Sequence, residues 1–143
     1  MDRLLLATSV VVVAAAVALI VQRRRPDAPM QGGASPAWPA PSQLDRTDFP
    51  RPGAAWLVAV FTSATCQSCA GALARANVLA SSAVAVEEAE RTARGDLHRR
   101  YGIEAVPTIV VADAHGVVRA SFVGPPPAAD LWAAVADARE SRD

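Results

Sequence analysis

Two cysteines separated by two residues are the side chains of this sequence best suited to chemistry. Cys66 and Cys69 flank Gln67 and Ser68, just after an apolar run at residues 56–61. This spacing brings the two sulfurs within bonding reach, so the first thiol could attack a disulfide and the second could resolve the mixed disulfide. A bridge between residues so close in sequence closes almost no loop and stabilises little. Redox exchange therefore explains the pair better than structural cross-linking.

The residues on either side of this pair predict the elements that hold it. Residues 56–61 are rich in strand formers and have the length of a buried strand. A helix is expected to start near Cys66 and to run through Leu73 and Leu79. The unpaired amide groups and the dipole at the start of such a helix stabilise a thiolate. A CxxC pair at a strand-to-helix junction therefore indicates a reactive Cys66.

The rest of the chain predicts a mixed sheet with helices around it. The expected elements are a buried strand at 83–86, a helix at 95–101 ending at Gly102, strands at 108–112 and 117–123, and a last helix after Pro127. Turn residues between the last two strands predict an antiparallel hairpin. This order predicts an α/β fold in which one mixed sheet of four to five strands is flanked by helices.

From about residue 57 to residue 138 the chain resembles the thioredoxin family. The resemblance rests on WLVAVF before CQSC, on YGIEAVPT further along, and on IVVADAHGVVRASFVG. It implies a thioredoxin-like fold and an enzyme of thiol-disulfide exchange, in which Cys66 attacks and Cys69 resolves. It also implies a cis peptide bond between Val106 and Pro107 that faces the sulfurs. By the same resemblance, Val106 offers its backbone to substrate chains by strand-like pairing.

The sequence departs from the family pattern around the cysteines. Thr65 stands where thioredoxins have Trp, and Gln67 and Ser68 stand where they have Gly-Pro; we expect all three residues to contact the substrate. Val60 occupies a position where the family often has a buried carboxylate that moves the proton of the resolving thiol. These departures leave an alternative open, a redox-silent thioredoxin-fold module that holds a partner peptide near the membrane.

Other ionisable residues offer weaker candidates for a site. A zinc site would need two more ligands, and we expect His98 on an exposed helix and His115 in a hairpin turn, where they do not supply them. Glu87, Glu88 and Glu90 follow the predicted second strand and indicate a solvated loop rather than an acid/base pair. We therefore expect neither a metal nor a cofactor.

Composition and charge limit the classes of partner. The 143 residues allow one domain plus an appendage. The 14 basic and 14 acidic residues cancel, which argues against nucleic acid as a partner. The expected partners are a protein disulfide substrate, an upstream thiol reductant and membrane lipid.

The start of the chain predicts a membrane anchor. Residues 4–21 are apolar and uncharged, and as a helix they would reach roughly 27 Å, close to a ~30 Å hydrocarbon core. We expect an anchor at 1–25, a Pro/Gly/Ala-rich linker at 26–43 and a thioredoxin-like domain at 44–143. Arginines rather than small residues follow the apolar stretch, which favours a retained single-pass anchor over a cleaved signal peptide. By the positive-inside rule, those arginines place the C-terminal domain in the cytoplasm.

Overall fold

The structure is a computed structural model that describes residues 39–141 of the chain. Within that range, no helix has the length and apolar character needed to cross a bilayer. The predicted anchor at 4–21 and most of the predicted linker lie outside the described residues. The anchor and its orientation therefore stay predictions.

Four strands form one mixed sheet, in agreement with the four to five strands predicted. Their order in space is β2 (Val84–Glu90), β1 (Trp56–Thr62), β3 (Thr108–Asp113) and β4 (Val118–Val123). β1 runs parallel to β2 and antiparallel to β3, and β3 and β4 form the predicted hairpin. Every residue of β1 is buried, because β1 lies inside the sheet and both of its faces are covered.

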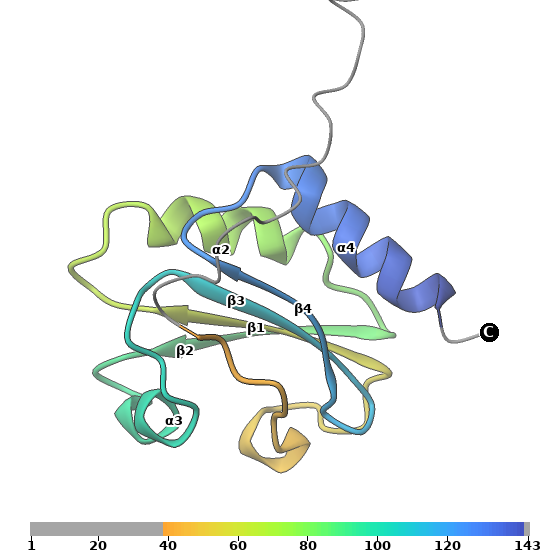
Figure 1. The fold of residues 1–143 in the computed structure, drawn as a ribbon, viewed down its shortest axis with the longest axis horizontal. Helices are drawn as coiled ribbons and strands as arrows, with labels where there is room; N and C mark the ends of the chain where they lie inside the picture. The colour runs from red at the N-terminus through yellow and green to blue at the C-terminus, as the bar shows by residue number, and fades with distance from the viewer. Residues whose placement is uncertain (1–38, 142–143) are drawn as a thin grey trace, which may run out of the picture. The chain divides into compact units, whose positions relative to one another are not determined.

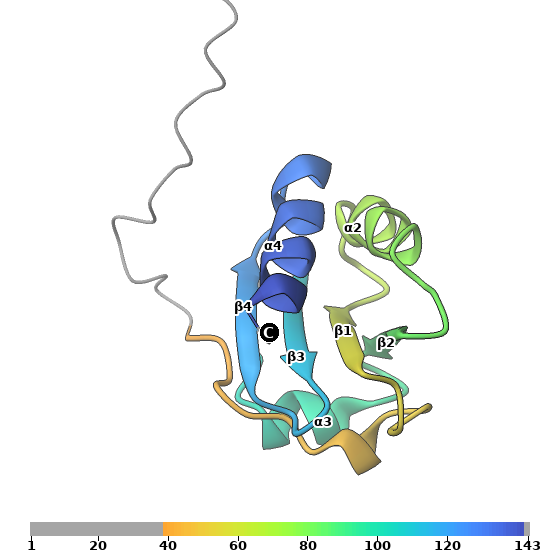
Figure 2. The ribbon, with the colours of Figure 1, turned by 90° about the vertical axis from the view of Figure 1, so that its right-hand side faces the viewer.

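Helices cover both faces of this sheet (Figure 1). α2 (Cys69–Asn77) and α4 (Ala128–Glu140) lie on one face, and α3 (Gly95–Arg100) and the 3-10 helix η1 (Arg46–Asp48) lie on the other. The view turned by 90° shows the same separation (Figure 2). The described part of the chain is therefore a three-layer α/β sandwich.

Each face of the sheet has its own hydrophobic cluster. Successive residues of a strand point to opposite faces, so β1 contributes to both. Val58 and Val60 pack with residues of α2 and α4, whereas Leu57, Ala59 and Phe61 pack on the α3 side. The uninterrupted apolar run of β1 is thus the shared centre of two cores.

The second strand is longer than predicted, and its glutamates do not form a loop. β2 continues through Glu87, Glu88 and Glu90, and its last residue pairs with Thr62 at the end of β1. The expected solvated loop was wrong because pairing along the full length of β1 holds these residues in strand geometry. β2 is also the edge of the sheet, where glutamate side chains can reach water.

His98 was expected on an exposed helix face, and this prediction was wrong. The side chain is 3% exposed, and its Nε2–H donates to the backbone oxygen of Ala89 at 2.8 Å. The ring meets Phe61 edge-on, with 5.3 Å between the ring centroids. α3 has only six residues, so packing on the sheet, rather than a clear periodic pattern, decides which of them are buried.

A segment before β1 packs on the sheet in a way that the sequence did not indicate. Gln43 bridges to Val117, and the Leu44 N–H donates to the Gly116 oxygen at 2.8 Å. Arg46 is 7% exposed, and its guanidinium donates to backbone oxygens of Asp113 and Ala54. These contacts tie the start of the domain to the β3–β4 hairpin.

Candidate active site

The cysteine pair lies where β1 ends and α2 begins. α2 starts at Cys69 and ends at Asn77, so the helix predicted from about Cys66 to Leu79 was too long at both ends. The Cys66 N–H donates to the Ser63 oxygen at 3.0 Å, and the Cys69 N–H donates to the Cys66 oxygen at 3.3 Å. Both bonds close turns, so the chain turns before the helical pattern begins, and Cys66 lies in that turn.

Cys66 and Cys69 are joined by a disulfide, with 5.4 Å between their Cα atoms. The two residues differ in their access to solvent. Cys66 is partly exposed, whereas Cys69 is 4% exposed. An incoming group can therefore reach Cys66 more easily, and Cys69 meets Cys66 from the inner side.

The three residues expected to contact the substrate surround Cys66. Thr65, Gln67 and Ser68 are all exposed. The Ser68 Oγ lies 3.7 Å from the Cys66 Sγ. The N–H groups of Gln67 and Ser68 have no acceptor among residues 39–141. Cys66 thus lies among uncharged polar side chains, next to two backbone N–H groups that have no acceptor among the described residues.

Pro107 lies at the same end of the sheet as the cysteines. Phe61 pairs with Thr108 across β1 and β3, which places the preceding Pro107 beside the end of β1. The Val106–Pro107 peptide bond is cis, as the resemblance implied. Pro107 is buried, and its oxygen accepts from the Gly124 N–H at 2.8 Å. Val106 is partly buried, and its N–H and C=O have no hydrogen bond among the described residues.

Solved thioredoxin structures share this fold. A thioredoxin mutant from Halobacterium salinarum NRC-1 is 22% identical over 74% of this chain and 95% of that chain, with a TM-score of 0.56. The Drosophila melanogaster germline thioredoxin Deadhead is 24% identical, with a TM-score of 0.53, over 60% of this chain and 83% of that one. Yeast mitochondrial thioredoxin 3 is 20% identical, with a TM-score of 0.51, over 59% and 79%.

The fold is thioredoxin-like. No family model and no curated protein sequence matches the chain. The likeness is therefore one of architecture. The chemistry depends on the residues that this thioredoxin-like fold brings to the end of β1.

Two carboxylates that were predicted to lie in a solvated loop instead lie in β2, at this end of the thioredoxin-like sheet. The Thr62 hydroxyl donates to the Glu88 carboxylate at 2.6 Å. The Glu90 carboxylate accepts the N–H of Ala64, in the cysteine turn, at 3.1 Å. Extending the predicted second strand would have placed both glutamates on one face by its two-residue alternation. The charged composition concealed that signal.

Glu90 connects the turn that carries the cysteines to the chain after β2. Its second carboxylate oxygen accepts the N–H groups of Thr92 at 2.7 Å and Ala93 at 3.0 Å. The hydrogen bond from Ala93, with those from Thr92 and Ala64, lowers the pKa of Glu90 below its ordinary value. The ionised carboxylate is therefore the form that holds these two segments together.

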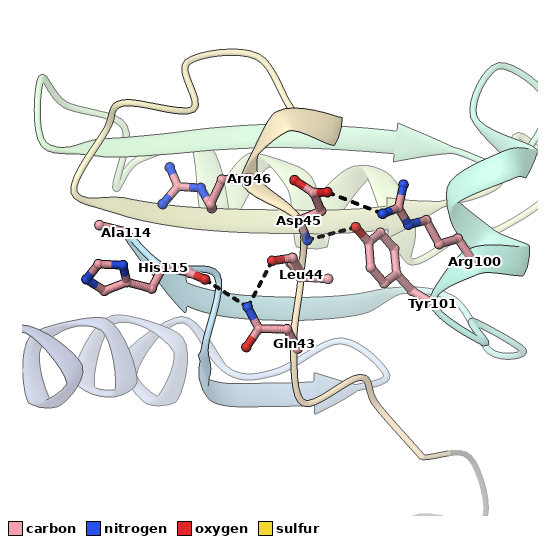
Figure 3. A pocket seen from close by; sticks show the side chains of 8 residues that line it. All are labelled: Gln43, Leu44, Asp45, Arg46, Arg100, Tyr101, Ala114 and His115. Atoms are coloured by element: carbon pink, nitrogen blue, oxygen red, sulfur yellow. Dashed lines mark hydrogen bonds and ion pairs between the residues drawn. The ribbon is translucent and has the colours of Figure 1, made fainter.

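A hollow lies away from the cysteines, on the α3 side (Figure 3). It is lined by residues 43–46 of the N-terminal segment, by 100–101 at the end of α3 and by 114–115 of the hairpin turn. Its polar groups bond largely to one another or to neighbouring backbone. It therefore serves packing between these three segments better than it would serve a ligand.

One network in that hollow shows how closely its groups are paired. Arg100 forms an ion pair with Asp45 at 3.3 Å, and the Asp45 N–H donates to the Tyr101 hydroxyl at 2.9 Å. The same hydroxyl donates to Asp48. Burial and the bond to Asp48 raise the pKa of Tyr101 to about 12, so this hydroxyl stays protonated at neutral pH.

Proposed function

We propose that the protein is a thiol-disulfide oxidoreductase that acts through Cys66 and Cys69. The observation that carries the proposal is the cysteine pair itself. A partly exposed cysteine is bonded to a 4% exposed cysteine that begins a helix at the end of a central strand. An accessible attacking thiol and a shielded resolving thiol are what exchange requires.

The exchange starts from the dithiol form. The Cys66 thiolate attacks one sulfur of the substrate disulfide, and the other substrate sulfur leaves as a thiolate. Cys69 then attacks the Cys66 sulfur, releases the second substrate thiolate and closes the Cys66–Cys69 disulfide. The substrate gains two electrons that the dithiol loses. An upstream thiol reductant must restore the dithiol.

Backbone groups support the first step. The start of α2 and the free N–H groups of Gln67 and Ser68 stabilise negative charge on the Cys66 sulfur. The unpaired N–H and C=O of Val106 support a partner that docks as an extended strand. A protein disulfide in an extended segment, or a small thiol compound, therefore suits this surface.

Replacing each cysteine by serine is expected to have a different effect on the exchange reaction. Cys66→Ser is expected to abolish reduction of a model disulfide by the full-length chain with an added thiol reductant, because no attacking sulfur remains. Cys69→Ser is expected to retain the attack and to accumulate a mixed disulfide with the substrate. Turnover assays and mass spectrometry of the trapped species measure these two outcomes.

Full activity in the Cys66→Ser protein would contradict the assignment of roles. A wild-type Cys66 that reacts with iodoacetamide at neutral pH no faster than free cysteine, in a pair that never re-forms its disulfide, would favour the redox-silent binding module.

We also propose that residues 1–25 tether this domain to the cell membrane, with the domain in the cytoplasm. The apolar stretch at 4–21 and the arginines after it support the proposal. A membrane-impermeant thiol reagent is expected to label the reduced cysteines only after cells are opened. Labelling in intact cells would reverse the orientation, and recovery of the chain in the soluble fraction would contradict the tether.

A further inference from the structure

The resolving step of the proposed exchange needs a proton acceptor. Cys69 must lose its thiol proton before it attacks, since the thiolate is the nucleophile. Cys69 is 4% exposed, so bulk water is a poor acceptor for that proton. Val60, a residue of β1 on the face of the sheet that carries α2, is apolar and fully buried. The acceptor therefore has to come from another element.

Glu88 lies beside Val60 on the neighbouring strand. β1 and β2 are parallel, and Val60 pairs with Glu88 in their register, so the two side chains leave the sheet on the same face. That face carries α2, because Val60 packs in one cluster with Ala72 and Ala76 of that helix. Glu88 thus shares a face of the sheet with the helix that begins at Cys69.

Thr62 directs the Glu88 carboxylate toward the end of β1. The Thr62 Oγ1 donates to the Glu88 Oε1 at 2.6 Å, and Thr62 is 2% exposed. Thr62 is also the last residue of β1 before the cysteine turn. The Glu88 Oε2 has no hydrogen-bond partner within the described range. One carboxylate oxygen is therefore anchored, and the other is open to a proton.

The charges around Glu88 leave it available for this role. Among residues 39–141, Glu88 has no ion pair. Glu90, the next residue of β2 on this face, is committed to three backbone N–H groups. Arg75 is the one charged residue of α2, and it forms no ion pair with Glu88.

We propose that Glu88 is the proton acceptor for Cys69 in the resolving step, an inference that rests on the proposed function. The Cys69 S–H bond breaks, and its proton passes to the Glu88 carboxylate, directly or through one water, which the exposure of Glu88 permits. The Cys69 thiolate then bonds to the Cys66 sulfur, and the bond from Cys66 to the substrate sulfur breaks. The departing substrate thiolate takes the proton from Glu88, so the carboxylate is restored.

The two attacks can be timed separately in the reduced full-length chain. The chromogenic aromatic disulfide dithiobisnitrobenzoate releases one aryl thiolate when Cys66 attacks and a second when Cys69 resolves. In Glu88→Gln we expect the first phase to be unchanged and the second to slow roughly 100-fold at neutral pH. Raising the pH should restore the second phase, because Cys69 then ionises without help. Glu88→Asp should slow it less.

Glu87→Gln is the matched control, since Glu87 is the adjacent residue of β2 and leaves the sheet on the opposite face. Its second phase should match that of the wild type. Val60→Asp in the Glu88→Gln background should restore part of the rate, because it returns a carboxylate to the same face from β1. Equal slowing in the Glu87 and Glu88 variants, or an unchanged second phase in Glu88→Gln, would overturn the proposal.

A wild-type chain without a first phase would refute the proposed function instead. Glu88 would still be tested by carbon NMR of its carboxyl group in the wild-type protein, which needs no turnover and no variant that folds. If Glu88 shares a proton with Cys69, its titration curve must differ between the dithiol and disulfide forms. Coincident curves would rule out the exchange of that proton.

Discussion

At each end of the sheet a carboxylate accepts backbone N–H groups of a turn, but the two carboxylates serve different purposes. At the hairpin end, the Asp113 carboxylate accepts the N–H groups of His115 and Val117 at 2.9 and 3.0 Å. At the cysteine end, the Glu90 carboxylate accepts the N–H groups of Ala64, Thr92 and Ala93. In both places a side chain replaces the backbone acceptors that a turn lacks.

The difference lies in burial and charge. Asp113 is 4% exposed and pairs with Arg119 at 2.7 Å, whereas Glu90 is partly exposed and has no ion pair within residues 39–141. Burial opposes ionisation of Asp113, but hydrogen bonds from Arg119, His115 and Val117 outweigh it and lower its pKa. The Asp113 carboxylate is thus fixed by an ion pair as well as by backbone N–H groups, whereas the Glu90 carboxylate is bonded to backbone N–H groups without an ion pair among residues 39–141. We expect changes at the first to affect stability and changes at the second to affect thiol reactivity.

The largest expected effect is from Gly116→Ala at the hairpin end. Gly116 has φ +79°, and an added Cβ would lie 1.9 Å from the Leu44 backbone oxygen. The strained conformation and the backbone clash together should cost roughly 3 to 5 kcal/mol, read by urea unfolding of the full-length chain. Gly124→Ala at the cysteine end is the matched control, with φ +93° but no atom within 4 Å of an added Cβ. Equal losses of unfolding free energy in the two variants would mean that the packing of the N-terminal segment on the hairpin contributes nothing to stability.

Asp113→Ala should have the next largest effect. It removes the acceptor of two partly buried backbone N–H groups and should lower the free energy of unfolding by about 2 to 3 kcal/mol. Arg119→Gln removes only the partly exposed ion pair and should cost less than about 1 kcal/mol. Both variants should keep the wild-type alkylation rate of Cys66. A changed rate would show that the two ends are coupled.

The smallest effect is expected at the cysteine end, from acidification. A carboxylate whose pKa is lowered in the folded state stabilises the fold above its ordinary pKa, 4.5 for Glu90, and that contribution is lost as the pH falls through the folded value. The Ala64 amide should therefore lose protection against hydrogen exchange on acidification, by roughly three- to tenfold.

Glu90→Gln should show that loss already at neutral pH and should vary little with pH. Unchanged protection of the Ala64 amide in this variant would mean that the Glu90 carboxylate does not stabilise the cysteine turn. The comparison with Asp113 at the other end of the sheet would then fail.

The strands with clear apolar patterns were predicted well, and β2, which has a charged end, was predicted too short. Residues 56–61 and 108–112 are apolar runs, and turn residues follow the second, so β1 and the β3–β4 hairpin were confirmed. The extension of β2 over Glu87, Glu88 and Glu90 was missed, because those residues have low strand propensity and only pairing with β1 holds them. The burial of His98 was missed for a related reason, since the six-residue α3 carries too few positions for a periodic signal.

For the candidate site, the CxxC spacing after an apolar strand was sufficient to single out Cys66 and Cys69, which the structure joins in a disulfide. The family resemblance further implied the cis bond before Pro107, which the structure confirms. The environment of the sulfurs was not accessible in this way. Which carboxylates come near them depends on the pairing of strands that are distant in sequence.

The sequence by itself determined the local chemistry of this protein: the apolar central strand, the thiol pair after it and the turn residues of the hairpin. Each follows from neighbours along the chain, where side-chain type and spacing act directly. Only the tertiary structure decided that Glu88 lies beside Val60, that Glu90 holds the cysteine turn and that Arg46 supports the hairpin. Those placements depend on strand register and on packing between segments far apart in the chain, which no local pattern encodes.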